Sequence, residues 1–413
     1  MARKNIIIAG AGFGGITSSL ILAKKIGNLR NEYEIILIDR HHHQLYTPAL
    51  YEIAAIPRES VSSLSLKSSI LIPINDIVSG KSIKFICDEV IGLESKERRV
   101  ILKNLGEIPY EYLTFALGSE TNYFGIPGLQ EHSFPLKTFD DAARLRNTIE
   151  DTLRKKEALK IVVGGAGASG VELVAEFVNF VCILKEKILP AVKVCNVEFL
   201  LIEAAPDILP GFDSWIINKT KKRLGRLGIR LKTSTSITNV SWQQIELEDG
   251  SQEPYDIFIW AGGVKGPSLF EKLNLPLSSK GALQIDEYLQ VRDAGGRILA
   301  IGDNSSFTNP HTGKPLVWNV PVAEEEGKLA AENILRAIQG REKKKFVPWT
   351  KYPYVLVVGG RYAIADLIYI RFWGILGLAA KALVELRYLL FILPPVKAFR
   401  TWAKAVHYYS LNN

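Results

Sequence analysis

A glycine-rich segment near the N-terminus has the residue types and spacing that bind a pyrophosphate. Gly10, Gly12 and Gly15 form a G-x-G-x-x-G pattern directly after the apolar stretch from Lys4 to Ala9, and a helical pattern follows from Ile16 to about Lys25. In such a unit the first glycine permits a tight turn, the second lets a pyrophosphate approach the backbone, and the third lets the helix pack on the strand. Unpaired N–H groups at the start of the helix then bind the phosphates.

An acid ends the next predicted strand. Asp39 follows the stretch from Glu34 to Ile38 and lies 29 residues past Gly10, where a carboxylate accepts hydrogen bonds from ribose hydroxyls. A glycine turn without a ligand is the alternative, but the strand, helix and acid together favour a dinucleotide. The residues expected to contact this first cofactor are Gly10, Gly12, Phe13, Gly14, Gly15, Asp39 and Arg40.

A second unit of the same kind occurs in the middle of the chain. The strand from Lys160 to Gly164 precedes Gly165-Ala-Gly167-Ala-Ser-Gly170, and a helix is predicted from Val171 to about Lys185. We expect Gly165, Gly167 and Gly170 to bind a second pyrophosphate.

The second unit also ends in an acid. The strand from Leu200 to Ile202 ends at Glu203, 38 residues past Gly165, and the stretch from Lys185 to Cys195 is interpreted as an insertion in the crossover. Glu203 has no adjacent arginine to receive a 2′-phosphate, so the pattern favours NADH over NADPH.

Two dinucleotide sites in one chain predict hydride transfer between a bound flavin and a diffusing nicotinamide. The order of the two units resembles the two-dinucleotide-binding flavoprotein disulfide reductase superfamily, and so do three later segments: Tyr112-Leu-Thr-Phe-Ala116-Leu-Gly118-Ser119, Ile257-Phe-Ile-Trp260-Ala261-Gly262-Gly263 and Ile298-Leu-Ala-Ile-Gly302-Asp303. The resemblance implies an α/β fold with two Rossmann-type domains, one for FAD and one for NADH. It also implies that Asp303 meets the ribityl chain of FAD and that Ala116, Gly118, Ala261 and Gly262 lie at the cofactors.

Five further segments resemble type II NADH dehydrogenases, the non-pumping NADH:quinone oxidoreductases of respiratory electron transport. They are Asp39-Arg-His-His-His-Gln-Leu-Tyr46-Thr47-Pro48-Ala-Leu-Tyr51-Glu52, Asn122-Tyr-Phe-Gly125-Ile-Pro127-Gly128, Leu136-Lys137-Thr138, Gly170-Val-Glu172-Leu and Val358-Gly-Gly-Arg361-Tyr-Ala-Ile-Ala-Asp366. The resemblance implies that Thr47 and Val90 contact FAD and that Glu172 lies near the reacting rings as a catalytic residue. The alternative for Glu172 is a carboxylate in the first turn of a helix, favoured by the helix dipole.

One departure from this family concerns the electron acceptor. Type II enzymes usually carry an Ala-Gln pair beside the quinone pocket, where this chain has Val320 and Pro321. Pro321 fits the first position of a helix. The sequence therefore supports NADH as donor more strongly than quinone as acceptor. Two alternatives stay open, a sulfide:quinone oxidoreductase and an NADH-binding redox sensor or assembly factor that acts through a protein partner.

The cysteines and histidines predict no metal site. Cys87, Cys182 and Cys195 form no C-x-x-C pair, so we interpret them as inert buried thiols in a reducing compartment. None takes a position expected to face the flavin, which disfavours the sulfide enzyme. His41 to His43 are consecutive, and side chains of consecutive extended residues point to alternate sides and do not chelate one ion.

Basic charge is concentrated near the C-terminus. Of the net charge of +8, residues 341–413 carry +9, from 12 Lys or Arg against 3 Asp or Glu, while the first 340 residues carry −1. No nucleic-acid recognition motif accompanies this charge, so an anionic membrane surface is the favoured partner and nucleic acid is not expected.

Pro394 and Pro395 divide this tail into two predicted helices. In the second helix, basic residues take one face and apolar residues a neighbouring one: Lys397, Arg400, Lys404 and His407 against Val396, Phe399, Ala403 and Val406. Such a helix is suited to a membrane interface. The alternative is packing on the body of the protein or on a second subunit of a homodimer. No apolar run of 18 residues occurs, so a spanning helix is not expected.

The length of 413 residues predicts two to three domains. We assign residues 1–120 and 266–340 to an FAD-binding domain, 121–265 to an NADH-binding domain and 341–413 to a membrane-binding region. The predicted protein is a peripheral enzyme of the cytoplasmic face that passes hydride from NADH to FAD and two electrons to a membrane quinone.

Overall fold

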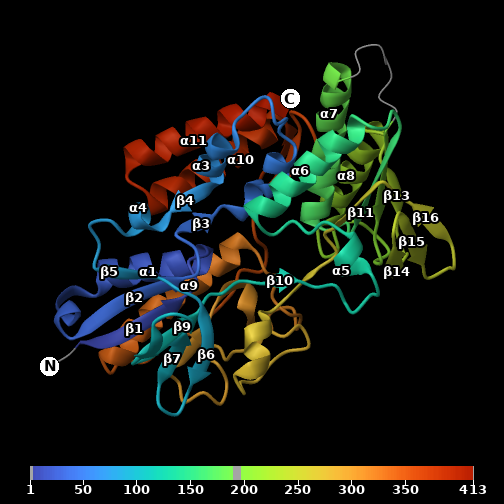
Figure 1. The fold of residues 1–413 in the computed structure, drawn as a ribbon. Coiled ribbons are helices and arrows are strands. Elements are labelled where there is room, and N and C mark those ends of the chain that lie inside the picture. The colour runs from blue at the N-terminus through green and yellow to red at the C-terminus, as the bar shows by residue number, and fades with distance from the viewer. Residues whose placement is uncertain (1–2, 189–196, 413) are drawn as a thin grey trace. The chain divides into compact units, whose positions relative to one another are not determined.

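The computed structural model describes residues 3–188 and 197–412, which form two compact units. Unit 1 comprises Met1–Leu45, Leu71–Glu120 and Val264–Tyr352, and unit 2 comprises Tyr46–Ile70, Thr121–Gly263 and Pro353–Asn413 (Figure 1). Each unit is described by itself below.

Unit 1 is built on a five-stranded parallel sheet with the order β20-β9-β1-β2-β5. Its strands are β1 (Lys4–Ala9), β2 (Tyr33–Asp39), β5 (Ile83–Cys87), β9 (Tyr112–Phe115) and β20 (Ile298–Ala300). The residues Ile6 to Ile8 are fully buried, as expected for a parallel strand covered on both faces. The helices α1 (Phe13–Lys25) and α9 (Val320–Ile338) pack against each other.

Smaller elements complete unit 1. An antiparallel meander contains β6 (Val90–Glu94), β7 (Arg99–Leu102) and β8 (Gly106–Pro109), and two strand pairs are β3 (His43–Leu45) with β4 (Leu71–Pro73) and β19 (Leu283–Gln284) with β21 (Ser305–Ser306). The short helices are α4 (Ile74–Val78) and the 3-10 turns η1 (Gly27–Asn31), η3 (Ser268–Lys272) and η4 (Gly302–Asn304). The two-residue strands β10 (Glu120–Thr121) and β18 (Val264–Lys265) lie where the chain passes between the units.

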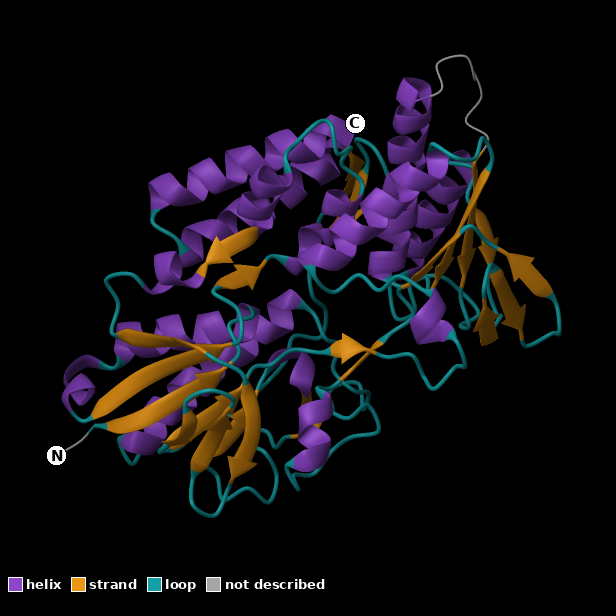
Figure 2. Ribbon diagram, in the orientation of Figure 1, coloured by secondary structure: helices purple, strands orange, loops and turns teal. Residues whose placement is uncertain are grey.

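Unit 2 contains a second parallel sheet, with the order β13-β12-β11-β17. Its strands are β11 (Leu159–Gly164), β12 (Val197–Ile202), β13 (Arg230–Lys232) and β17 (Ile257–Trp260), and its longer helices are α6 (Phe139–Leu153), α7 (Ala168–Ile188) and α8 (Ser214–Arg226). Unit 2 also has an antiparallel meander of β14 (Ile237–Ser241), β15 (Gln244–Leu247) and β16 (Gln252–Pro254) and the short helix α5 (Leu129–His132) (Figure 2). Side chains of α5, β14 and β15 form an apolar core with the sheet.

The C-terminal residues also belong to unit 2. They form the antiparallel meander β22 (Tyr354–Val357), β23 (Ala363–Asp366) and β24 (Arg371–Gly374), the helices α10 (Ile375–Ile392) and α11 (Pro395–Tyr409), and the turn η5 (Ser410–Asn412). The predicted division at Pro394 and Pro395 is confirmed. Within the described residues, no helix combines the length and the hydropathy needed to cross a membrane.

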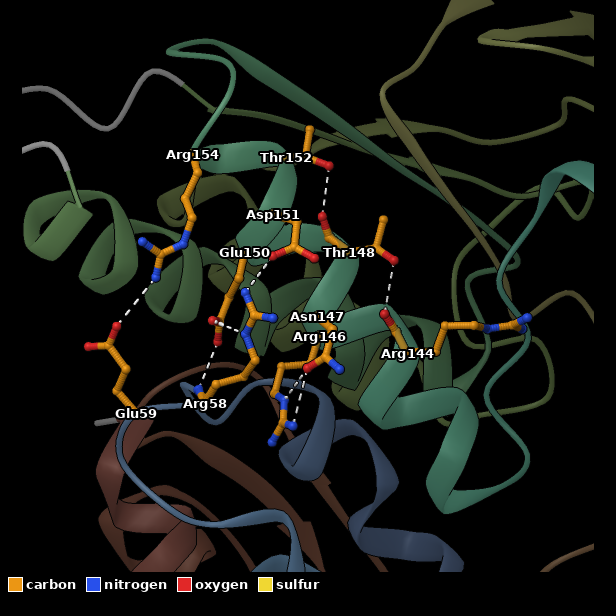
Figure 3. A network of polar contacts seen from close by, with 10 residues as sticks. All are labelled: Arg58, Glu59, Arg144, Arg146, Asn147, Thr148, Glu150, Asp151, Thr152 and Arg154. Atoms are coloured by element: carbon orange, nitrogen blue, oxygen red, sulfur yellow. Dashed lines mark hydrogen bonds and ion pairs between the residues drawn. The ribbon is translucent and has the colours of Figure 1, made fainter.

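Residues 46–70, which the sequence analysis assigns to the FAD-binding part, cluster with unit 2. They form η2 (Thr47–Ala49), α2 (Leu50–Ala54) and α3 (Ser63–Ile70). Figure 3 shows one reason: Arg58 is fixed to α6, where its Nε donates to Glu150 Oε2 at 2.6 Å, its backbone N–H donates to Glu150 Oε1 at 2.8 Å, and its Nη2 meets Asp151 at 2.6 Å. Sequence patterns within residues 46–70 do not indicate this long-range ion pair.

The strands predicted at both glycine loops are confirmed, but the following helices start earlier than predicted. They begin at Phe13 and Ala168, because the loop residues take helical geometry as soon as the glycine turn ends. The helix α7 extends to Ile188, so the first part of the predicted insertion is helix, and residues 189–196 lie outside the described residues.

One cysteine prediction was wrong. Cys182 is half-buried and disulfide-bonded, whereas Cys87 is a free thiol, and Cys195 lies outside the described residues. A disulfide depends on two Cα atoms approaching to roughly 4.4–6.8 Å in the fold, which cysteine spacing along the chain does not reveal.

Candidate functional site

The first glycine loop connects β1 to α1 and has no room for side chains at two of its positions. Gly10 has φ +110°, and a Cβ there would lie 2.2 Å from the carbonyl oxygen of Ala116. A Cβ on Gly15 would lie 1.9 Å from the carbonyl oxygen of Gly10. In contrast, the nearest atom to a Cβ on Gly12 would be 4.0 Å away. The loop therefore packs tightly at its first and third glycines and leaves space at the second, which fits a pyrophosphate approaching the backbone.

The second loop, between β11 and α7, repeats this geometry. Gly165 has φ +98°, and a Cβ there would lie 2.4 Å from Gly262 Cα, while a Cβ on Gly170 would lie 2.0 Å from the Gly165 carbonyl oxygen. A Cβ on Gly167 would meet nothing within 4 Å. Ala261 and Gly262 follow β17 and lie against this loop.

The two strand-end acids are held in the same way. Asp39 accepts hydrogen bonds from the backbone N–H groups of Ala11 (2.7 Å) and His41 (2.8 Å). Glu203 accepts from the backbone N–H groups of Ala166 (2.6 Å) and Ala205 (2.8 Å). Each carboxylate is thus fixed beside its glycine loop and keeps lone pairs for further donors such as ribose hydroxyls.

The segment around Asp303 lies beside the residues that follow β9. Asn304 is fully buried, its side-chain oxygen accepts from the Leu117 backbone N–H, and its amide donates to the Phe115 carbonyl oxygen at 3.1 Å. Ser119 Oγ donates to Asp303 Oδ2 at 3.2 Å. The structure therefore brings the segments that contain Ala116, Gly118 and Asp303 together in unit 1.

Sequence reasoning missed the carboxylate that supports this turn. Glu326 of α9 is buried and accepts from the Gly302 backbone N–H at 2.6 Å and from Ser305 Oγ at 3.2 Å. Burial raises the pKa of Glu326 to about 8, so the carboxyl is protonated at neutral pH. The sequence signal for this buried carboxyl was the position of Glu326 among the apolar residues on one face of the predicted helix.

Val320 and Pro321 begin α9, and Pro321 is the second residue of the helix, one position later than predicted. Asn319 caps this helix, since its side-chain oxygen accepts from the Val322 backbone N–H at 2.9 Å. A Cβ on Gly14 would lie 3.1 Å from the Ala323 carbonyl oxygen. The first turn of α9 is therefore packed against the first glycine loop.

The other three residues predicted to contact FAD are Arg40, Val90 and Thr47, and they lie away from the glycine loop in the sequence. Arg40 pairs with Glu89 at 3.7 Å, and Val90 is buried at the start of β6, both in unit 1. Thr47 lies in unit 2.

The three consecutive histidines do not gather around one point. The rings of His41 and His43 stack with their centroids 5.4 Å apart. Among the described residues, no group of three or more His, Cys, Asp or Glu side chains is arranged to hold a metal ion.

Glu172 lies on α7 in a cluster of four acids and one lysine from three segments of unit 2, in which Glu52, Glu176 and Glu385 are buried and the other two are half-buried. The cluster consists of Glu52 on α2, Glu172 and Glu176 on α7, and Lys381 and Glu385 on α10. Lys381 pairs with Glu52, and its ammonium lies 5.2 Å from the Tyr51 ring centroid and 5.0 Å from that of Tyr409. Glu172 accepts a hydrogen bond from the Val357 backbone N–H at 3.3 Å.

Four carboxyls and one ammonium cannot all be ionised in this buried place. Burial raises the pKa of Glu172 and of Glu176 to about 8 and that of Glu385 to about 7, and the Lys381 charge only partly opposes this effect. Burial also opposes the charge of Lys381, but its pairing with Glu52 outweighs this, and the pKa of Lys381 is raised. Glu172 and Glu176 are therefore mostly protonated at neutral pH.

The helix-dipole alternative for Glu172 is wrong. Glu172 is the fifth residue of α7, and the first turn of that helix contains no acidic residue. A carboxylate stabilised by a helix N-terminus would have a lowered pKa, whereas the pKa of Glu172 is raised. The spacing of Glu172 to Glu176 and of Lys381 to Glu385, four residues in each helix, was the one sequence signal for the cluster.

The chain matches known proteins along most of its length. A type II NADH:quinone oxidoreductase from Staphylococcus aureus (strain NCTC 8325 / PS 47) is 27% identical over 355 residues, which cover 83% of this chain and 85% of that protein. A structure of NDH2 from Plasmodium falciparum in complex with NADH superimposes with a TM-score of 0.83 at 20% identity and covers 98% of both chains. The sulfide:quinone oxidoreductase from Aquifex aeolicus superimposes with a TM-score of 0.75 at 16% identity and covers 94% of this chain and 91% of that one.

These two superpositions show a shared fold. The model of the pyridine nucleotide-disulphide oxidoreductase family matches residues 4–327, which include both glycine loops, both strand-end acids and Asp303. The chain therefore belongs to the pyridine nucleotide-disulphide oxidoreductase family.

Proposed function

We propose that this protein is an FAD-dependent NADH:quinone oxidoreductase of the type II, non-pumping kind. The observation that carries the proposal is the pair of glycine loops with one geometry, each with a carboxylate fixed beside it and space at its second glycine. The similarity to the Staphylococcus aureus enzyme, which covers most of both chains, supports NADH as donor and quinone as acceptor.

The residues of this chain fit both cofactors. In unit 1, FAD would be held by the backbone of the Gly10 to Gly15 loop, by Asp39 at the adenosine ribose and by Asp303 at the ribityl chain. In unit 2, NADH would be held by the loop from Gly165 to Gly170 and by Glu203. When bound, FAD accepts hydride from NADH and passes two electrons to the quinone.

The acid cluster supplies a proton that this reaction consumes. NADH, one proton and a quinone give NAD⁺ and a quinol, so the hydride of NADH brings only one of the two hydrogens that the quinol gains. We assign the other to the protein, with Glu172 as its donor, because Glu172 is protonated at neutral pH and has Glu176 on the next turn to share protons.

The C-terminal region is proposed to bind the cytoplasmic face of a membrane, where the quinone is dissolved. On α11, Val396 and Phe399 are 64% and 49% exposed, and Lys397 and Arg400 are exposed beside them, while Ala398 and Ala405 face the protein. This arrangement leaves an apolar stripe and a basic stripe on the outside, as an interfacial helix requires.

Steady-state assays with the FAD-loaded protein test the proposed reaction. We expect NADH oxidation to require an added short-chain quinone and to be much slower with NADPH, because no arginine adjoins Glu203. Sulfide should not replace NADH. Faster quinone reduction with sulfide than with NADH, or NADH oxidation that no quinone accelerates, would contradict the proposal.

A further inference from the structure

A second feature of unit 2, outside the dinucleotide loops and the acid cluster, is a row of cations on α8. Lys219 precedes the adjacent pair Lys222 and Arg223 by three and four residues, and this pair precedes Arg226 by four and three, so all four lie along one side of the helix. Like charges at these spacings destabilise a helix by ~0.2–0.5 kcal/mol per pair. The helix dipole favours cations in the last turn of α8, but it does not account for Lys219 in the middle of the helix.

The four cations surround a hollow of about 180 Å³ together with Tyr362 and Trp373. The Lys219 ammonium lies 3.5 Å from the Trp373 ring centroid, and the Arg223 guanidinium lies 5.0 Å from that of Tyr362. Arg223 is also fixed by hydrogen bonds to the carbonyl oxygens of Val358 (3.1 Å) and Gly359 (2.9 Å). The aromatic rings and these hydrogen bonds hold cationic groups at the hollow instead of leaving them extended in water.

None of the four cations forms an ion pair with a carboxylate among residues 3–188 and 197–412, and no carboxylate lines the hollow; the Arg223 charge acts on Glu176, where it opposes the rise in pKa that burial causes. Lys221 on the same helix differs, because it pairs with Asp207 at 2.7 Å. The hollow thus combines several positive charges with space for an anion. At about 180 Å³ it is smaller than the ~300–1,000 Å³ of pockets that enclose a whole organic ligand. Its size suits a phosphate-bearing headgroup.

Exposed apolar residues lie close in sequence to Trp373, one of the residues that line the hollow. Trp373, which lines it, belongs to β24, and the turn before that strand carries Tyr369 and Ile370, which are 94% and 63% exposed. Ile375 and Leu376, at the start of α10, are each 68% exposed. A soluble anion gains nothing from such neighbours, whereas a phospholipid offers a charged phosphate and acyl chains at once.

We propose that the α8 hollow is a binding site for the phosphate headgroup of an anionic phospholipid, with the exposed side chains of Tyr369, Ile370, Ile375 and Leu376 inserted among the adjacent acyl chains. The site deepens the proposed membrane association and rests on it. It extends the membrane contact from the C-terminal helices to α8 of the nicotinamide-binding part.

Vesicle co-sedimentation of the full-length, FAD-loaded protein tests this site. The variant is Lys219→Gln with Lys222→Gln, and the matched control is Lys155→Gln with Lys272→Gln, which removes the same charge at two exposed lysines outside the hollow. On phosphatidylcholine vesicles that contain phosphatidylglycerol, we expect the variant to lose about 30-fold in partitioning, or about 5-fold per cation, which corresponds to ~1 kcal/mol per cation near an anionic surface. The control should lose less than about 2-fold. On pure phosphatidylcholine, the variant and the wild type should bind equally.

Two further comparisons distinguish a lipid headgroup from a soluble anion, and the headgroup site from membrane binding in general. Inorganic phosphate, at the ionic strength of a chloride control, should not displace the wild type from the vesicles, and displacement would assign the hollow to a soluble anion. Equal losses in the variant and the control would show a diffuse charge effect and overturn the site. A wild type that binds no vesicle would overturn the membrane proposal as well, whereas a variant that binds like wild type would overturn only the headgroup site.

Discussion

At the scale of single residues, Glu172 differs from a surface glutamate because its carboxyl is protonated at neutral pH. Burial raises the pKa of Glu172 to about 8, so most molecules carry the protonated carboxyl at pH 7. A donor must be protonated to act, so the proton-donating form is lost as pH rises through about 8. The quinone-dependent rate of the wild type should therefore fall above this pH.

Substitution of this donor should separate the two halves of the reaction. In Glu172→Gln we expect quinone-dependent turnover to fall by ~10²-fold or more, the usual contribution of a positioned general acid, while NADH still reduces the flavin at a rate near that of the wild type. The pH dependence near pH 8 should also disappear. Glu186→Gln, an exposed position on the same helix, is the control and should behave like wild type. Unchanged turnover in Glu172→Gln would remove Glu172 from the mechanism.

Glu203 is expected to act in binding and not in chemistry. Glu203→Ala removes the acceptor for ribose hydroxyls, at ~1–1.5 kcal/mol for a hydrogen bond, so the KM for NADH should rise about 10-fold with kcat within about 2-fold of wild type. Glu203→Gln retains one acceptor oxygen and should have an intermediate KM. Steady-state kinetics at saturating quinone measure both constants. A KM that stays at the wild-type value in Glu203→Ala would contradict the ribose assignment.

At the scale of elements, each glycine loop has positions that serve the fold and one that serves the ligand. Gly170 packs α7 against the loop, since a Cβ there would lie 2.0 Å from the Gly165 carbonyl oxygen, whereas the space at Gly167 is open. Gly170→Ala should therefore lower the thermal midpoint of the protein. Gly167→Ala should leave that midpoint nearly unchanged and raise the KM for NADH.

The two alanine variants control each other, because both add one methyl group to the same loop. Differential scanning fluorimetry gives the midpoints, and NADH titration of the initial rate gives KM. Equal loss of stability in both variants, or an unchanged KM in Gly167→Ala, would show that the loop does not receive the pyrophosphate in the way proposed.

The elements around the two loops could be predicted from the sequence because local signals set them. The strand Lys4–Ala9 is bounded by the Gly10 turn and reads as a continuous apolar run, and Pro394 with Pro395 ends one helix and begins the next. Both helix starts were predicted three residues too late, because α1 and α7 begin inside their glycine motifs.

The acid cluster could not be predicted, because it is made of long-range contacts. Glu52 and Lys381 form an ion pair across 329 positions of sequence, and neither residue has a local pattern that identifies its partner. The same reason applies to Arg58 with Glu150 and to Glu326 with Gly302. Local periodicity identifies which face of a helix is buried, but only the fold decides which buried polar groups meet.

At the scale of the whole molecule, one chain contains two units with glycine loops, a cluster that holds protons at neutral pH and the region proposed to bind a membrane. Each unit has its own parallel sheet and its own loop, so each can bind its cofactor with its own residues. The central claim is that the chain passes electrons from NADH through FAD to a quinone.

Stopped-flow absorbance with two successive mixings tests this claim most directly. The FAD-loaded protein is first mixed with NADH and then, after the flavin spectrum has changed, with a short-chain quinone. The account predicts rapid bleaching of the flavin band by NADH and full recovery of that band on addition of quinone. A flavin that NADH does not bleach, or a bleached flavin whose recovery no quinone accelerates, would contradict it.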